Sequence, residues 1–177
     1  MFVIACLGNP GKKYSKNRHN IGFIMGDYIA ERYGIQVSAS SFDSVSGKGT
    51  IDGIEALLLM PQTYMNNSGG PVRQALAFYK VPPEFLVAIH DDIELPFGEC
   101  RSKFGGGHKG QNGIRSIIQE LGTPDFHRIR FGVGRPENPE VAVADHVLSN
   151  FSGEELSRIR DNAPAVMDMV VSIMKAR

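Results

Sequence analysis

The alternation of short apolar runs with stretches of helical periodicity is the feature that most limits the folds open to this sequence. The run Phe2–Leu7 predicts a strand, and apolar residues at helical spacing predict a helix over residues 20–33. Further along, strands predicted at 85–90 and 128–133 enclose a helical pattern at 114–121. Strands that alternate with helices are joined by crossover connections, which favours an α/β fold with parallel strand pairs.

One segment departs from this alternation and predicts a hairpin. The runs 44–51 and 54–60 flank Asp52-Gly53, a dipeptide typical of two-residue β-hairpin turns. A hairpin contributes an antiparallel pair, so we expect a twisted mixed sheet surrounded by helices.

The remaining elements complete this pattern. A helix is predicted at 72–79 and a more polar strand at 99–104. Ser152 and Glu155 have the spacing of a capping box, which predicts the start of a last helix, and Pro164 is expected to kink or interrupt that helix.

Length and composition bound the organisation of the chain. With 177 residues, no repeat and no linker-like tract, residues 1–177 are expected to form one domain, interpreted as a monomer. A hydrophobic content of 42% excludes a disordered chain, and apolar stretches such as 56–60 are too short to cross a bilayer. The N-terminus lacks a signal-peptide pattern, which predicts a cytoplasmic protein.

Cys6 and Cys100 form no C-x-x-C pair, so neither a disulfide framework nor a zinc site is suggested.

Charge is balanced overall but not locally. The formal net charge is zero, yet residues 10–20 carry four basic and no acidic side chains, and residues 101–135 carry seven basic against two acidic ones. Such stretches are compatible with a phosphate-bearing partner, and the alternative is ordinary solvated surface loops.

Polar side chains follow the predicted strands at their carboxyl ends. Asn9 comes after the first strand, Asn66 follows the second strand of the hairpin, and Asp91 lies at the end of the 85–90 strand. In open α/β sheets ligands bind outside these ends, so we expect the three to converge. Taken singly, each asparagine is also a good turn or helix-entry residue.

His19 lies in a loop directly before the first predicted helix and is a candidate general base. A neutral imidazole can take a proton from water near neutral pH if a carboxylate such as Asp91 holds the right tautomer. The alternative is a solvent-exposed or helix-capping histidine. The chain contains no metal-binding histidine motif and no calcium loop, so no metal is expected.

A glycine-rich loop follows the 99–104 strand. Gly105, Gly107 and Gly110 satisfy the spacing of a dinucleotide-binding loop, but the preceding strand is charged and no acid follows at the required distance. A dinucleotide-dependent enzyme therefore remains a weak alternative. Backbone N–H groups at a helix start, close to basic side chains, suit an anion such as a phosphate chain.

Six separated strings occur together in one order and resemble bacterial-type peptidyl-tRNA hydrolases. The resemblance covers residues 2 to about 150 and implies one α/β domain that hydrolyses the ester between peptide and tRNA, without a metal or other cofactor, to recycle tRNA. The strings are Leu7-Gly8-Asn9-Pro10-Gly11, Tyr14 with Arg18-His19-Asn20, Thr63 to Gly69, His90-Asp91 to Leu95-Pro96, Gly105-Gly106-Gly107-His108 to Asn112-Gly113, and Phe126-His127-Arg128 to Gly134.

The resemblance also implies roles for individual residues. His19 would be the general base and Asp91 its partner. The implied substrate-positioning amides are Asn9, Asn66 and Asn112, the contacts to the tRNA 3′ end are Tyr14 and Tyr64, and the tRNA-phosphate contacts are Arg101, Lys103 and Arg130.

Two departures from the family pattern affect these expectations. Gln111 stands where many relatives carry histidine, and it can donate a hydrogen bond but cannot titrate. The chain ends at Arg177, earlier than many relatives, so contacts from a longer C-terminal tail are expected to be missing. Because the family also has relatives in plant organelles that serve intron splicing, an RNA-binding protein without catalysis is the main alternative.

Overall fold

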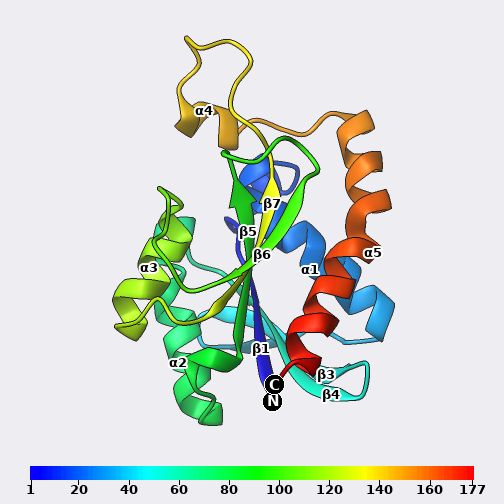
Figure 1. Cartoon of the computed structure of the whole chain (residues 1–177), viewed down its shortest axis with the longest axis vertical. Helices are drawn as coiled ribbons and strands as arrows, with labels where there is room; N and C mark the ends of the chain where they lie inside the picture. The colour runs from blue at the N-terminus through cyan, green and yellow to red at the C-terminus, as the bar shows by residue number, and fades with distance from the viewer.

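A computed structural model describes all residues, 1–177, and contains one seven-stranded sheet with helices on both faces (Figure 1). The strands are β1 (Phe2–Cys6), β2 (Ala39–Ser41), β3 (Ser44–Ile51), β4 (Ile54–Pro61), β5 (Leu86–Asp92), β6 (Cys100–Phe104) and β7 (His127–Gly132). The helices are α1 (Ile21–Tyr33), α2 (Gly69–Tyr79), α3 (Asn112–Leu121), α4 (Val143–Val147) and α5 (Gly153–Lys175). Single 3₁₀ turns occur at η1 (Lys12–Tyr14), η2 (Arg18–Asn20), η3 (Met65–Asn67) and η4 (Pro83–Phe85).

The sheet is mixed, as the sequence predicts. Its strand order is β2-β3-β4-β1-β5-β7-β6. The four neighbouring strands β4, β1, β5 and β7 run parallel. The hairpin partner β3 and the edge strand β6 are antiparallel to their neighbours. The chain leaves β1 toward β4 on one side and later returns to β5 on the other side. The carboxyl ends of β1 and β5 therefore flank the switch point where α/β sheets bind ligands.

Alternation along β1 explains how the helices are divided between the two faces. Phe2, Ile4 and Cys6 belong to a buried cluster with residues of α1 and α5. Val3 and Ala5 point the other way, into a second cluster with residues of α2 and α3. Figure 1 shows these two helix pairs on opposite sides of the sheet.

Several element boundaries differ from the sequence expectations. Helix α2 begins at Gly69 rather than near residue 72, because Gly69, Gly70 and Pro71 fit its first turn. Strand β2 and helix α4 are additional elements. Pro164 does not interrupt α5, which is continuous over 23 residues. Both Pro164 and Arg160, whose carbonyl loses its helical partner, are exposed, so water can hydrate that carbonyl.

No helix has both the length and the apolar character needed to cross a membrane.

Candidate active site

The loops at the carboxyl ends of β1, β4 and β5 line a cavity with a volume of about 490 Å³. This volume lies in the range of small-ligand sites. The expected convergence of Asn9, Asn66 and Asp91 is confirmed, since all three line the cavity. The other predicted site residues that line it are His19, Tyr14, Tyr64, Asn112, Lys103 and Arg130.

The close packing of α1 on the sheet brings His19 over the end of β5. His19 lies in η2, and α1 starts directly after it. Gly22, in the first turn of α1, leaves no room for a side chain, because a Cβ there would clash with the carbonyl oxygens of Leu7 and Ile89. The helix start therefore rests on the backbone of β1 and β5, and the preceding turn overhangs Asp91.

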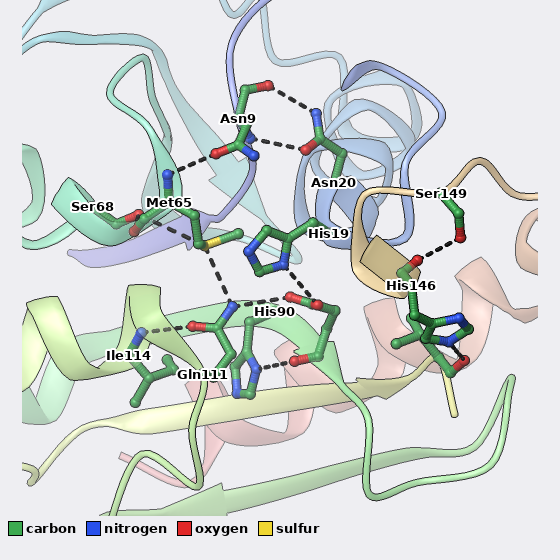
Figure 2. A network of polar contacts seen from close by, with 12 residues as sticks. Asn9, His19, Asn20, Met65, Ser68, His90, Gln111, Ile114, His146 and Ser149 are labelled. Carbon is green, nitrogen blue, oxygen red and sulfur yellow. Dashed lines mark hydrogen bonds and ion pairs between the residues drawn. The ribbon is translucent and has the colours of Figure 1, made fainter. Parts of the chain in front are cut away.

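His19 and Asp91 form a hydrogen-bonded pair at the carboxyl end of β5 (Figure 2). Nδ1 of His19 lies 2.8 Å from Oδ2 of Asp91, and the two side chains are 13% and 3% exposed. A carboxylate accepts the Nδ1 proton, so the neutral ring carries its free lone pair on Nε2. Burial lowers the pKa of His19, but the charge of Asp91 and its hydrogen bond outweigh burial and hold the pKa above its ordinary value.

Gln111 supports the same carboxylate from the opposite side. Its Nε2 donates to Oδ1 of Asp91 at 3.0 Å, while its Oε1 accepts the Ile114 N–H at 2.8 Å and caps α3. Both oxygens of Asp91 are thus engaged, one by an imidazole and one by an amide. The sequence indicated a hydrogen-bond donor at this position, but the direct contact with Asp91 depends on the loop geometry.

His90 is a second imidazole beside the first, and its properties are opposite. It is buried, and its Nδ1 lies 2.8 Å from the Asp91 backbone oxygen, to which it donates. Burial holds the pKa of His90 below its ordinary value, more strongly than the nearby carboxylates raise it. Near neutral pH this ring is uncharged, and its bonded nitrogen fixes the end of β5.

The amide of Asn9 has a defined orientation. Its Oδ1 accepts the Met65 N–H at 2.7 Å, which leaves its NH₂ group to face the cavity. Its backbone is held by Asn20, whose side chain accepts the Asn9 N–H and donates to the Asn9 carbonyl, each at 2.9 Å (Figure 2). Asn9 can therefore offer a fixed donor to an oxygen atom in the cavity.

The outer wall of the cavity is aromatic and amide-rich. The rings of Tyr14 and Tyr64 meet edge to face with centroids 6.2 Å apart, and Tyr64 is 55% exposed. Asn66 in η3 and Asn112 at the start of α3 are also exposed on this rim. Free amides and ring faces in one place suit a ligand that combines hydrogen-bonding groups with flat bases.

Cationic side chains from β6 and β7 form another wall. Lys103 and Arg130 line the cavity, and Nε of Arg130 donates to Asp92 at 2.7 Å. Burial, followed by the neighbouring charges of Arg128 and Arg130, lowers the pKa of Lys103. Arg101 pairs with Arg130 in the β6–β7 register but lies outside the cavity, exposed and hydrogen-bonded to Glu99 at 2.8 Å. Of the three predicted phosphate contacts, the structure brings two to the cavity.

Arg128 holds the glycine-rich loop in place through hydrogen bonds to its backbone. It is 1% exposed, and its guanidinium donates to the carbonyls of Gly106, Gly107 and Pro124 at 2.8–2.9 Å. The loop follows β6, which is an antiparallel edge strand rather than the buried parallel strand that precedes a dinucleotide loop. The geometry therefore does not support the dinucleotide alternative.

Helix α4 forms an apolar wall that sequence reasoning missed. Val143, Ala144, Val147 and Leu148 line the cavity together with Ile93. The helix has five residues and no side-chain cap, so it carries too little periodicity to be recognised.

The side chains contain no cluster of three or more His, Cys, Asp or Glu that could hold a metal ion.

The fold and cavity define an α/β protein with a histidine–carboxylate pair at the switch point of its sheet. The family model described as "Peptidyl-tRNA hydrolase" matches residues 3–177. The peptidyl-tRNA hydrolase of Geotalea daltonii is 45% identical over 98% of this chain and 87% of its own length. That of Brevibacillus brevis is 46% identical over 95% of this chain and 88% of its own length.

Solved structures agree with the sequence comparisons. The crystal structure of peptidyl-tRNA hydrolase from Acinetobacter baumannii superposes with a TM-score of 0.91 at 37% identity, covering 99% of this chain and 89% of that one. The chain belongs to the peptidyl-tRNA hydrolase family.

Proposed function

We propose that this protein hydrolyses the ester bond between the peptide and the tRNA in peptidyl-tRNA, releasing free tRNA for reuse in translation. Family membership over nearly the whole chain supports the reaction. The observation that carries the assignment to this site is the His19–Asp91 pair, 2.8 Å apart, in the wall of the cavity at the carboxyl ends of β1, β4 and β5.

His19 is the general base in this proposal. With Nδ1–H donated to Asp91, Nε2 accepts a proton from water while the water oxygen attacks the ester carbonyl. A tetrahedral oxyanion forms, and its collapse breaks the bond to the ribose oxygen. The protonated imidazole then returns its proton to that leaving oxygen. Asp91 stabilises the imidazolium in between and does not itself take the proton.

Asn9 is suited to the developing oxyanion. Its oxygen is occupied by the Met65 N–H, so only its NH₂ group is free. A fixed donor aimed at a carbonyl oxygen stabilises the charge that appears in the transition state, which is worth about 10²–10³ in rate for one well-placed donor. Asn66 and Asn112, exposed on the rim, would orient the peptide amides.

The remaining walls fit the RNA portion of the substrate. Tyr14 and Tyr64 offer ring faces to the unpaired bases of the 3′ end. Lys103 and Arg130 would meet phosphates, with Arg101 as an outer contact from the same face of the sheet. The apolar wall formed by α4 leaves room for peptide side chains.

Location and assembly follow from the same proposal. Because peptidyl-tRNA is made in translation, we place the protein in the cytoplasm. We further propose that residues 1–177 act as one domain and as a monomer. Light scattering on purified protein measures the mass directly, and a dimer that loses activity on dilution would contradict the monomer.

The function is tested with two substrates. Purified protein should release the amino acid from an N-acetylated aminoacyl-tRNA and spare the same aminoacyl-tRNA with a free amine. Binding of both RNAs without cleavage of either would instead indicate an RNA-binding protein on this scaffold.

A further inference from the structure

The turn that carries His19 is attached to a segment far along the chain. Residues 149–155, which we call the strap, connect α4 to the first turn of α5. Asn17 and Asn150 form a β-bridge, and the Asn17 side chain donates to Asn150 Oδ1 at 2.7 Å. The backbone N–H of Arg18 donates to the Ser149 carbonyl at 3.1 Å. The residue next to the proposed base is therefore part of a contact between distant segments.

The side chain of Arg18 makes this attachment specific. Nη1 donates to Ser149 Oγ at 2.9 Å and to the Asn150 carbonyl at 2.6 Å. Nη2 donates to both carboxylate oxygens of Glu155, at 2.9 and 3.2 Å. The two side chains are only 14% and 26% exposed, so this pair is shielded from water more than an ordinary surface ion pair.

Glu155 links Arg18 to the longest helix of the molecule. Its Oε1 also accepts the Ser152 N–H at 2.9 Å, and the Ser152 Oγ accepts the Glu155 N–H at 3.1 Å. These reciprocal bonds form the capping box that starts α5. The carboxylate thus joins the helix start to the turn of His19.

The strap also begins where the apolar wall of the cavity ends. Val147 and Leu148 line the cavity, and Ser149 follows at once. None of Arg18, Ser149 and Glu155 lines the cavity. The proposed base and the apolar wall are therefore held by one set of contacts that lies outside the site.

We propose that Arg18 and Glu155 are positioning residues that hold the His19 turn against β5, so that the catalytic rate depends on the strap. This inference rests on the proposed function for its kinetic consequence. Asp91 is fixed by β5 and Gln111, whereas His19 depends on its turn for its place. A displacement of about 1 Å at a reacting group can cost about 10²-fold in rate.

Steady-state kinetics on four variants tests the proposal. Arg18→Gln removes the paired charge-assisted bonds and should lower kcat by about 10- to 100-fold while KM changes by less than about threefold, since binding groups lie on other elements. Arg18→Lys keeps the charge and should recover part of the rate. Glu155→Gln should lower kcat, whereas Ser152→Ala, which loses the cap but keeps the Arg18–Glu155 pair, should not.

A second readout does not need the reaction. In the ligand-free protein, the NMR titration of the His19 ring reports its contact with Asp91, whose charge raises the pKa of His19. Arg18→Gln should move the titration midpoint down toward the ordinary value, and Ser152→Ala should leave it in place. This shift is expected even if the wild-type protein fails to cleave the substrate, which separates the two proposals.

Two results would overturn the positioning role. The first is a folded Arg18→Gln protein with unchanged kcat and an unchanged His19 titration. The second is equal loss of kcat in Glu155→Gln and Ser152→Ala in proportion to lost stability, because that pattern indicates helix stability alone. Should Arg18→Gln fail to fold, as judged by circular dichroism, Arg18→Lys and Glu155→Gln decide the question by the same two readouts.

Discussion

At the scale of single residues, two neighbouring imidazoles differ because of what surrounds them. Asp91 raises the pKa of His19 by more than burial lowers it, whereas burial lowers the pKa of His90 by more than the nearby carboxylates raise it. The pKa of His19 therefore lies above its ordinary value and that of His90 below it. A base must be unprotonated to act, so the rate is expected to rise with pH through a midpoint above 6.5.

Asp91→Asn changes this profile in a defined direction. The negative charge of Asp91 and one of its two carboxylate oxygens are lost, while His19 stays buried. The pKa of His19 is therefore expected to fall below its ordinary value. We expect the midpoint of kcat/KM against pH to move down and the plateau rate to fall by about 10²–10⁴-fold. Rates measured from about pH 5 to about pH 9, a range that includes the titration of a histidine side chain, check this. An upward shift of the midpoint would contradict the assignment.

Gln111 makes a separate prediction at the same scale. Gln111→Leu removes the donor to Asp91 Oδ1 and leaves that oxygen buried without a partner, so both activity and stability should fall, the latter by about 1–3 kcal/mol. Gln111→Glu places a second carboxylate beside Asp91 and should raise the pKa of His19 further, moving the pH midpoint up. Unchanged pH profiles in both variants would show that Gln111 does not act on the pair.

At the scale of elements, the closeness of α1 to the sheet decides where His19 lies. Gly22→Ala would place a Cβ against the backbone oxygens of Leu7 and Ile89 and push the helix start outward. We expect a stability loss of about 1–3 kcal/mol, measured by urea unfolding, together with a loss of activity. Gly70→Ala in α2 is the matched control, because a Cβ there meets nothing within 4 Å. Equal effects of the two substitutions would exclude close packing as the cause.

Some of these elements could be predicted from local sequence patterns, and others could not. The apolar run of β1 and the Asp52-Gly53 turn were predictable, because periodicity and turn chemistry are local properties. Strand β2, with three exposed residues, and helix α4, with five residues, lack a local signal, since each depends on the neighbour it packs against. The convergence of Asn9, Asn66 and Asp91 could be anticipated from their positions after strand ends, whereas the Gln111 contact and the burial of Arg128 depend on loop conformations that no local pattern encodes.

At the scale of the whole molecule, a neutral chain carries a cationic wall. Lys103 and Arg130 lie together at the cavity although basic and acidic residues balance at 19 each. If each meets a phosphate, substituting either by Gln should reduce the slope of log binding constant against log salt concentration by about one unit. Arg160→Gln, on the exposed side of α5, is the control with the same charge change and should leave the slope unaltered. Equal slopes in all variants would remove these side chains from the RNA interface.

The most direct test compares the wild-type protein with His19→Ala in cleavage of an N-acetylated aminoacyl-tRNA, with RNA binding measured on the same samples. Loss of the base should reduce turnover by about 10²–10⁴-fold. Binding of the RNA should remain, because its proposed contacts come from other side chains. Turnover within a few fold of wild type would contradict water activation by His19 and, with it, the role assigned to Asp91.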